Sequence, residues 1–315
     1  MKNNLKSQNV FVTGGHGFIG SHLVKKLLYS GANVSILAKE HANLCRIKTV
    51  LKDIQILNGD IKDTDRVQEI ITQIQPDYLF HLAADSGHSP QNNTINKINT
   101  NILGTTNIME AIKRTGCKKI INLGSSSEYG VSETPIHENT PLNPQDVYGI
   151  TKLAATQIAH HIAMKNKINI VTLRPFNVFG EAAPPEHLFG YIISRLIQNQ
   201  EVFLSKCIQT RDYCYIENII TGMILAATKS SLKNEIFNIG SGDSHPLKYF
   251  VKKIFQHFDS KKEPHYGAIP YSFNERMHVA SDVSKIKKVL DWKITISLEQ
   301  GIEKTIEWYQ STQNK

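Results

Sequence analysis

Short apolar segments alternate with longer segments of helical period from about residue 8 to residue 173, and this rhythm limits the possible folds more than any other feature. The apolar segments are rich in Ile and Val and are apolar on both faces, which is typical of strands buried in a parallel sheet. The expected strands are Asn9–Thr13, Asn33–Leu37, Ile54–Leu57, Tyr78–Leu82, Lys119–Leu123 and Asn169–Leu173. The expected helices between them are Phe18–Ser30, Thr64–Gln73, Thr94–Arg114 and Pro144–Lys165.

Strand–helix alternation predicts right-handed crossovers, and therefore an α/β fold with a doubly wound parallel sheet of the Rossmann type. After residue 175 the rhythm is broken by prolines. The later elements are expected at Leu188–Asn199, Val202–Leu204, Glu235–Ile239, Ser284–Leu290 and Leu298–Tyr309. We therefore predict a first domain over residues 1–175 and a smaller α/β lobe over residues 176–315, interleaved with the first domain.

Composition and charge restrict the class of protein. Of the 315 residues, 40% are hydrophobic and 20% are charged, as in ordinary globular proteins. No apolar run reaches the roughly 18 residues that a membrane helix needs, and the N-terminal apolar stretch is too short for a signal peptide. The four cysteines form no C-x-x-C pair and no His-flanked metal pattern, so we expect reduced thiols, no metal site and a cytoplasmic protein.

The net charge of +8 favours anionic ligands such as a dinucleotide or a nucleotide diphosphate. It would also suit nucleic acid, but the sequence has no basic run interleaved with aromatic residues and no nucleic-acid motif. We therefore expect small anionic ligands and no nucleic acid.

A glycine-rich turn follows the first expected strand, where the sequence reads TGGHGFIG and leads into an amphipathic helix. Gly14 permits a tight turn, Gly17 lets the backbone approach a pyrophosphate, and Gly20 permits close packing of helix on strand. The N–H groups at the start of the helix, at Phe18 and Ile19, offer a partial positive charge to the phosphates. The turn predicts that the first domain binds a dinucleotide.

The end of the second strand indicates which dinucleotide is bound. An acidic residue there normally holds the adenosine ribose of NAD, but this chain has Ala38 and Lys39, with Arg46 further on. Cations at this place are able to pair with a 2′-phosphate, so the sequence favours NADP(H) and leaves NAD open. After the third strand, Asp60 and Ile61 are expected beside the adenine ring, with Asp60 accepting from its amino group.

Tyr148 and Lys152 lie on the last long helix expected in the first domain. Their i, i+4 spacing puts a phenol and an ammonium on one helical face. A tyrosine of ordinary pKa, about 10, is a poor base, but a nearby ammonium and a positive nicotinamide would lower that pKa. The pair is then able to move a proton at a carbinol oxygen while hydride moves at carbon. Ser125 and Ser126, after the fifth strand, add hydroxyls at the sheet edge where ligands bind.

Together these motifs resemble the extended short-chain dehydrogenase/reductases, and within them the nucleotide-sugar epimerases, dehydratases and 4-keto reductases. The resemblance rests on the glycine turn, the serine segment GSSSEYG over residues 124–130, the Y-x-x-x-K pair, the sequence LRPFNVFG over residues 173–180 and RDY over residues 211–213. It extends from about residue 8 to residue 309. It implies an enzyme of carbohydrate biosynthesis that acts on a nucleotide diphosphate sugar.

The resemblance also implies roles for single residues. Ser125 would meet the substrate hydroxyl, Tyr148 would be the acid/base, and Lys152 would tune the phenol and bind the ribose. The cofactor would also contact Leu82, Ala83, Ala84 and Asn101, and the substrate would contact Ser126, Asn177 and Arg211. For His88, just past the fourth strand, a contact with the sugar is the less favoured interpretation.

Three departures from the family pattern bear on the reaction. Members that eliminate water place an acidic residue where this chain has Ser127; Glu128 stands one step along, where an extended backbone would point it to the other face. This disfavours a 4,6-dehydratase unless the loop kinks. The NAD-type aspartate is missing from the second strand. The arginine that often precedes a Gly-Asp step is replaced by Ser272, with Arg276 as a substitute.

Two reactions remain in the foreground. The NADP-type features favour a reductase of a 4-keto-(6-deoxy)hexose nucleotide, with Tyr148 as the acid. The alternative is a 4-epimerase that keeps NAD tightly bound, while a 4,6-dehydratase or a non-catalytic cofactor sensor is less favoured. The expected helices Thr94–Arg114 and Pro144–Lys165 are similar to those that form a four-helix interface in relatives, so we expect a homodimer.

Overall fold

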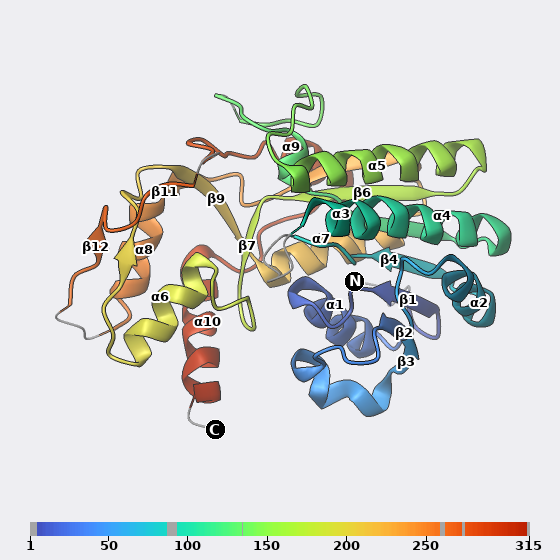
Figure 1. Ribbon diagram of the computed structural model, residues 1–315, viewed down its shortest axis with the longest axis horizontal. Coiled ribbons are helices and arrows are strands. Elements are labelled where there is room, and N and C mark those ends of the chain that lie inside the picture. Colours follow the sequence, from blue (N-terminus) through green and yellow to red (C-terminus); the bar gives the residue numbers. More distant parts are fainter. Residues whose placement is uncertain (1–4, 87–92, 134, 259–261, 273–274, 314–315) are drawn as a thin grey trace. The chain divides into compact units, whose positions relative to one another are not determined.

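The computed structural model describes residues 5–86, 93–133, 135–258, 262–272 and 275–313. The chain forms two compact units and passes between them repeatedly (Figure 1). Unit 1 consists of Met1–Gly130, Pro141–Pro175 and Ile220–Phe237. Unit 2 consists of Val131–Thr140, Phe176–Ile219 and Asn238–Lys315.

Unit 1 is built on a seven-stranded sheet of order β10-β6-β5-β4-β1-β2-β3. Its strands are β1 (Asn9–Thr13), β2 (Asn33–Ala38), β3 (Gln55–Asn58), β4 (Tyr78–His81), β5 (Lys119–Leu123), β6 (Ile170–Pro175) and β10 (Glu235–Ile239). From β3 across to β6, each neighbouring pair of strands is parallel. The predicted α/β fold with a doubly wound parallel sheet is confirmed.

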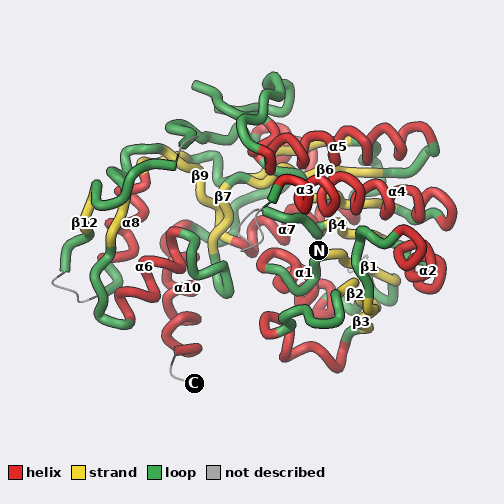
Figure 2. The backbone as a smooth tube through the Cα atoms, in the orientation of Figure 1, coloured by secondary structure: helices red, strands yellow, loops and turns green. Residues whose placement is uncertain are grey.

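Helices connect these strands, as Figure 2 shows. They are α1 (Phe18–Tyr29), α2 (Thr64–Ile74), α3 (Thr94–Lys97), α4 (Gly104–Thr115), α5 (Val147–Lys165) and α7 (Ile216–Thr228). The single helix expected over Thr94–Arg114 is interrupted by a π-helical turn at Ile98–Leu103. Two short 3-10 segments, Cys45–Asp53 and Ser126–Glu128, were not expected from the sequence.

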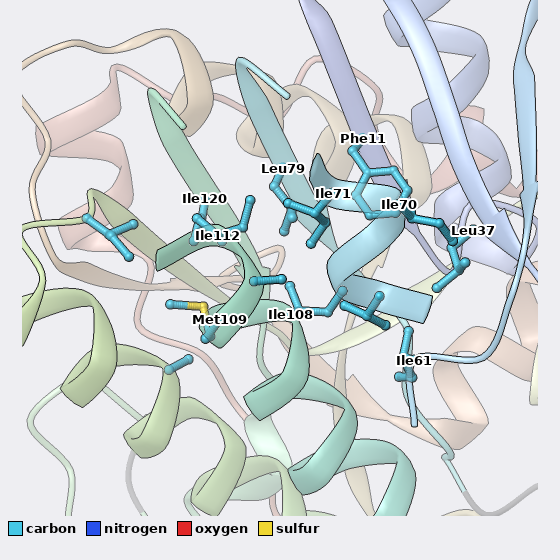
Figure 3. Packing of buried hydrophobic residues seen from close by; sticks show 14 of the residues in the cluster. Phe11, Leu37, Ile61, Ile70, Ile71, Leu79, Ile108, Met109, Ile112 and Ile120 are labelled. Carbon is cyan, nitrogen blue, oxygen red and sulfur yellow. The ribbon is translucent and has the colours of Figure 1, made fainter. Parts of the chain in front are cut away.

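The core of unit 1 lies between the sheet and the helices α2, α4 and α5. Phe11, Leu79 and Ile120 come from three adjacent strands. They face Ile70 of α2 and the aliphatic side chains of α4 (Figure 3). Burying each such side chain stabilises the fold by about 1.5–3 kcal/mol. This packing holds the strand ends, and the loops that follow them, in fixed positions.

The strand order reverses between β1 and β4, which lie side by side with Thr13 opposite His81. From β1 the chain proceeds outward through β2 and β3, and from β4 it proceeds the other way through β5 and β6. Ligands of doubly wound sheets bind outside the carboxyl ends of the strands at such a reversal. The glycine turn and the residues after β4 both lie there.

Unit 2 contains smaller sheets, one of order β11-β9-β7 and one that pairs β12 with β8. Its strands are β7 (Asn177–Phe179), β8 (Phe203–Leu204), β9 (Thr210–Tyr215), β11 (Ser244–Pro246) and β12 (His265–Tyr266), and its helices are α6 (Leu188–Ile197), α8 (Leu247–Phe255), α9 (Ser284–Leu290) and α10 (Leu298–Gln313). Phe179 stacks on Phe189 at 4.3 Å between ring centroids, and Tyr213 packs against Phe189 and Phe250. This aromatic cluster is its apolar centre.

No helix in the described part of the chain is both long enough and apolar enough to cross a membrane. Among the described residues, no group of three or more His, Cys, Asp or Glu side chains is arranged to hold a metal ion. All four cysteines are free thiols, with Cys207 and Cys214 buried.

Candidate active site

The glycine turn joins β1 to α1 and packs against the chain that leaves β4. Gly14 has a left-handed φ of +71°, and a Cβ added there would lie 2.8 Å from the backbone nitrogen of Ala83. A Cβ on Gly20 would lie 2.1 Å from the carbonyl oxygen of Gly14. Only glycine fits at either place. The turn therefore brings the start of α1 and the β4 exit together, as a dinucleotide-binding turn requires.

The first turn of α1 offers backbone donors to an anion. The helix begins at Phe18 after Gly17, and no side chain among the described residues caps its N-terminus. No acidic residue stands in the first turn. Uncapped N–H groups and the helix dipole favour a phosphate at this end. This geometry fits the cofactor role expected for Gly17, Phe18 and Ile19.

Lys39 and Asp60, which were predicted to have separate cofactor roles, contact each other. The Lys39 ammonium lies 3.0 Å from the Asp60 carboxylate, and Lys62 lies 3.5 Å from it. Burial raises the pKa of Asp60, but the Lys62 backbone N–H and the Lys39 ammonium outweigh that effect and hold the pKa below its usual value. The single Asp60 carboxylate thus compensates part of the positive charge expected to meet a 2′-phosphate.

The segment after β4 is fixed by buried polar contacts. The Asn101 side chain accepts a hydrogen bond from the Asp85 N–H at 2.7 Å and donates to the Asp85 carbonyl at 3.1 Å and to Thr151 on α5 at 3.0 Å. His81, buried between Thr13 and Thr105, has its pKa lowered to about 3, chiefly by burial. Asn101, predicted as a cofactor contact, is bonded to the protein itself and holds the loop that carries Leu82, Ala83 and Ala84.

Ser125, Tyr148 and Lys152 meet at the carboxyl end of β5. The Ser125 hydroxyl lies near enough to the Tyr148 phenol to lower its pKa, and the Lys152 ammonium donates to the Leu123 carbonyl at 2.6 Å. Asp146 caps α5 by accepting from the Gly149 N–H at 2.7 Å. A Cβ on Gly149 would lie 2.5 Å from the Ser127 carbonyl oxygen, so the serine segment and the first turn of α5 pack tightly.

The chain's own residues do not produce the lowering of the Tyr148 pKa that was predicted for the site with a bound nicotinamide. Burial raises the pKa of Tyr148 to about 12; the Ser125 hydroxyl lowers it, and Glu128 and Asp146 raise it further. Burial also lowers the pKa of Lys152, against the attraction of Glu128. The helical spacing could not show that desolvation and two nearby carboxylates outweigh the effect of the Ser125 hydroxyl on the Tyr148 pKa.

Glu128 does not face outward as a candidate acid. The serine segment does kink, into the 3-10 turn Ser126–Glu128, but the kink buries Glu128 completely and pairs it with Arg174 at 2.8 Å. Ser126, expected at the substrate, is only 5% exposed. The position that holds an acid in water-eliminating relatives remains Ser127.

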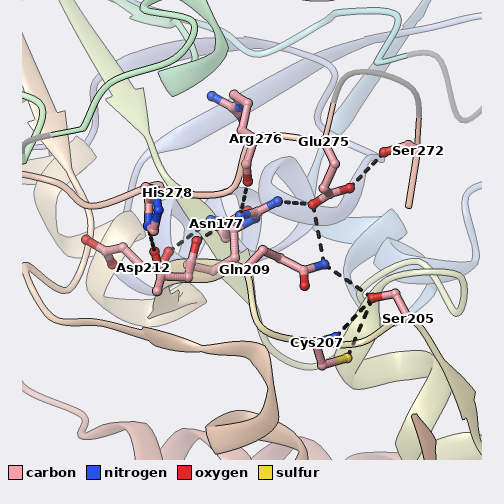
Figure 4. A network of polar contacts seen from close by, with 11 residues as sticks. Asn177, Ser205, Cys207, Gln209, Asp212, Ser272, Glu275, Arg276 and His278 are labelled. Carbon is pink, nitrogen blue, oxygen red and sulfur yellow. Dashed lines mark hydrogen bonds and ion pairs between the residues drawn. The ribbon is translucent and has the colours of Figure 1, made fainter. Parts of the chain in front are cut away.

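The two substrate candidates of unit 2 belong to one polar network (Figure 4). Asn177 donates to the Asp212 carbonyl at 3.2 Å. Arg211 forms an ion pair with Glu275 and donates to the Arg276 carbonyl at 2.6 Å. Arg276 thus enters the network through its backbone, and its side chain points away from it (Figure 4).

A cavity of about 330 Å³ lies beside this network and was not predicted from the sequence. Its lining includes Tyr191 of α6, Phe203 of β8, Cys207, Tyr271 and Glu275. The lining comes from short, distant segments with no common period, so no sequence signal marks it except that Glu275 lies near the replaced arginine.

Two further histidines were considered from the sequence. For His160 the sequence favours a surface or interface position over a ligand role; the side chain is half-buried and bonded to Thr172 of β6 at 2.9 Å. His88 lies outside the described residues.

Comparison with known proteins agrees with this architecture. The model of the NAD dependent epimerase/dehydratase family matches residues 10–240. A UDP-N-acetyl-alpha-D-glucosaminuronate decarboxylase of Bacillus cytotoxicus is 30% identical over 96% of this chain and 98% of its own length. The crystal structure of the UDP-glucose 4-epimerase of Thermotoga maritima with UDP-glucose is 27% identical, with a TM-score of 0.90 over 97% of this chain and 99% of its own. MoeE5, solved with UDP-glucose and NAD, is 26% identical, with a TM-score of 0.87 over 97% and 99%.

Proposed function

The chain belongs to the NAD dependent epimerase/dehydratase family, and from that premise we propose that it is a nucleotide-sugar 4-epimerase that retains NAD through the reaction. The observation that carries the proposal is the meeting of Ser125, Tyr148 and Lys152 at one strand end, with Glu128 buried and committed to Arg174. The group moves a proton at an alcohol or ketone, but it includes no acid for the elimination of water.

Unit 1 is proposed as the dinucleotide-binding unit and unit 2 as the lobe that selects the substrate. The uncapped start of α1 would hold the pyrophosphate, and Asp60 and Ile61 would border the adenine. NAD is preferred over the NADP(H) that the sequence favoured, because Lys39 is already paired with Asp60 and because MoeE5 was solved with NAD. When bound, NAD accepts hydride from a sugar carbon and returns it, and its positive ring favours the phenolate of Tyr148.

The chain's own residues would handle the proton. With its pKa raised to about 12, the Tyr148 phenol holds its proton at neutral pH and is suited to donate it to the oxygen of a 4-ketone. In the opposite direction the phenolate takes the proton of the 4-hydroxyl. Ser125 would hold the same oxygen, and Lys152, fixed by the Leu123 carbonyl, would support the charge on the phenol.

The substrate is proposed to be a UDP-sugar, since the named relatives bind or act on UDP-sugars. Arg211 and Asn177 are the proposed contacts of its diphosphate, and Ser126 is retained as a contact through its backbone. The Arg211–Glu275 pair is half-buried, so the guanidinium is accessible to an anion.

Epimerisation is tested by mixing the purified protein with UDP-glucose, without added cofactor, and measuring UDP-galactose by anion-exchange chromatography or NMR. Tyr148→Phe should lower turnover by at least about 100-fold while NAD stays bound. Absence of interconversion for UDP-glucose, UDP-N-acetylglucosamine and UDP-glucuronate would reject the proposal.

A 4-keto reductase is the second candidate, supported by Ala38, Lys39 and the absence of a carboxylate at the end of β2. It predicts that NADPH absorbance falls when a 4-keto-6-deoxy nucleotide sugar is added. A decrease with that substrate, together with no epimer, would select the reductase.

A homodimer is proposed through the outer faces of α3, α4 and α5. Ile95 is 65% exposed, Ile150 is 51% exposed and Met164 is 58% exposed, and all three lie on these helices. Exposed aliphatic side chains on adjoining helices favour burial against a second copy. Ile150→Glu should convert a dimer to a monomer in light scattering, and an unchanged mass would contradict this interface.

A further inference from the structure

The buried carboxylate of Glu128 joins the serine segment to helix α5 and strand β6. One oxygen of Glu128 accepts from the Ser125 N–H at 2.9 Å and from the Thr156 hydroxyl of α5 at 3.1 Å. The other oxygen accepts from Nε of Arg174 on β6 at 2.8 Å. The side chains of Glu128 and Arg174 are 0% and 2% exposed. No part of this carboxylate is left for a substrate.

Ser125 and Glu128 form reciprocal side chain–backbone hydrogen bonds within the 3-10 turn. Ser125 stands at the N-cap of the 3-10 turn, where its hydroxyl oxygen accepts from the Ser127 N–H at 3.1 Å while the Glu128 side chain takes the Ser125 N–H. A capping box of this kind fixes both backbone and side chain. The Ser125 oxygen accepts this one bond from the Ser127 N–H, and the Ser125 hydroxyl also lowers the pKa of the neighbouring Tyr148 phenol.

The surrounding backbone is shaped to leave room for the carboxylate. A Cβ added to Gly124 would lie 2.6 Å from an oxygen of Glu128 and 3.1 Å from Cγ of Arg174. The Arg174 guanidinium lies 4.6 Å from the ring centroid of the buried Tyr129, which holds it in place from the other side. The carboxylate therefore has one position available.

We propose that Glu128 is a positioning residue for the Ser125–Tyr148–Lys152 group, fixing the Ser125 hydroxyl relative to the Tyr148 phenol by tying the serine segment to α5 and β6. The inference rests on the proposed function and deepens it, because it names what holds the proton-transfer geometry. Glu128 acts only through Ser125 and through its charge, so it is not itself a catalytic residue.

The charge of Glu128 should be felt by both titrating partners. Glu128 and the α5 cap Asp146 face the phenol and raise the pKa of Tyr148, beyond the larger effect of burial. Glu128 also raises the pKa of Lys152 against the lowering by burial. From the other elements, Arg174 of β6 and Thr156 of α5 face the carboxylate, and His160 of α5, with its pKa lowered to about 4 by burial, faces Arg174. A carboxylate here thus favours protonated forms of both the phenol and the amine.

Two substitutions of Glu128 separate the effect of its negative charge from the effect of its side-chain length. Glu128→Gln keeps the size and removes the charge, and Glu128→Asp keeps the charge but is too short to reach all three partners. Both should lower kcat, by about 100-fold for a misplacement of about 1 Å, with little change in KM. Only Glu128→Gln should move the pH profile, toward lower pH, because only that variant removes the negative charge.

A measurement without substrate or cofactor keeps the test independent of the reaction. The Tyr148 phenol is followed by NMR of the protein labelled with 13C-tyrosine, with Tyr148→Phe identifying its signal. The wild-type phenol should stay protonated where ordinary tyrosines titrate, at about pH 10, and Glu128→Gln should titrate at lower pH than wild type. This titration can be interpreted even if the protein shows no epimerase activity. The proposed function and the proposed role of Glu128 are therefore tested independently.

Lys119→Met is the matched control. Lys119 is a second buried charge in unit 1, 2% exposed, and it lies at the opposite end of β5, where its ammonium donates to the Ala226 carbonyl at 3.1 Å. Its loss should lower stability without moving the Tyr148 titration. A Glu128→Gln phenol that titrates as in wild type, or a Lys119→Met phenol that shifts equally, would overturn the inference.

Discussion

The two units each contain an arginine–glutamate ion pair, and the pairs differ in burial. In unit 1 the side chains of Arg174 and Glu128 are 2% and 0% exposed, whereas in unit 2 those of Arg211 and Glu275 are 13% and 20% exposed. A fully buried pair cannot exchange its partner, so each charge must be satisfied within the protein. A partly exposed pair can release an arginine to an incoming anion. Similar chemistry therefore fixes a loop in one unit and leaves a ligand-accessible cation in the other.

The largest effect should come from breaking the buried pair. Arg174→Met leaves the Glu128 carboxylate buried without its cation, which should lower the free energy of unfolding by about 3–5 kcal/mol. Urea unfolding measures the loss. The double variant Arg174→Met/Glu128→Met should recover most of it, since replacing both charges by apolar groups removes the desolvation cost. A single-variant loss of about 1 kcal/mol or less would place this pair with ordinary surface pairs.

The accessible pair should affect binding more than folding. Arg211→Met should weaken the binding of UDP by about 10–100-fold, as expected for loss of charge-assisted hydrogen bonds worth about 1.5–3 kcal/mol. Titration calorimetry with UDP measures the change. Lys253→Met serves as the control, because Lys253 pairs with Glu299 at 3.0 Å away from the Arg211–Glu275 network. Unchanged affinity in Arg211→Met would show that this arginine is structural, like Arg174.

Acid should destabilise unit 1 through its buried histidines. The pKa of His81 is lowered to about 3 and that of His160 to about 4, in each case chiefly by burial. In the unfolded chain a histidine takes up a proton at about pH 6.5. The unfolded state therefore binds more protons below that pH, and stability should fall as the pH decreases from about 6.5 toward 4.

Urea midpoints at a series of pH values test this expectation. His160→Gln keeps a hydrogen-bonding side chain toward Thr172 and should make the acid-induced loss smaller. A loss of equal size in the variant would mean that His160 is protonated in the folded state.

The smallest effect should come from the most exposed pair, Lys39–Asp60, whose side chains are 63% and 28% exposed. Lys39→Met should change the free energy of unfolding by less than about 1 kcal/mol, as exposed pairs do. NAD affinity should change little, because the proposed cofactor has no 2′-phosphate to meet the lysine. A large selective loss of NADP(H) binding in fluorescence titration would instead support the NADP(H) preference indicated by the sequence.

Much of unit 1 was predictable because its signals are local. Strand Lys119–Leu123 was predicted to the residue, and β1 likewise, since each is a short apolar run bounded by turn residues. Helices α7 and α8 were missed. Helix α7 (Ile216–Thr228) follows β9 directly, without a boundary of the usual turn residues. Helix α8 (Leu247–Phe255) was missed although Pro246 stands directly before it.

In the candidate site, too, only the features that depend on local sequence could be predicted. The glycine turn and the Tyr148–Lys152 spacing are encoded within a few residues of sequence, and the structure brings these residues to the strand ends as expected. The Lys39–Asp60 contact, the bonding of Asn101 and the burial of Glu128 depend on neighbours distant in the chain.

The sequence alone determined the alternation of strands and helices up to about residue 173, the glycine turn and the helical face shared by a phenol and an ammonium, since each follows from backbone geometry over short spacings. Tertiary structure alone decided which charges are paired and what the Tyr148 pKa is. Arg174 lies 46 residues from Glu128, and Arg211 lies 64 residues from Glu275. Such contacts, and the desolvation that raises the phenol pKa, arise only when distant segments pack together and exclude water.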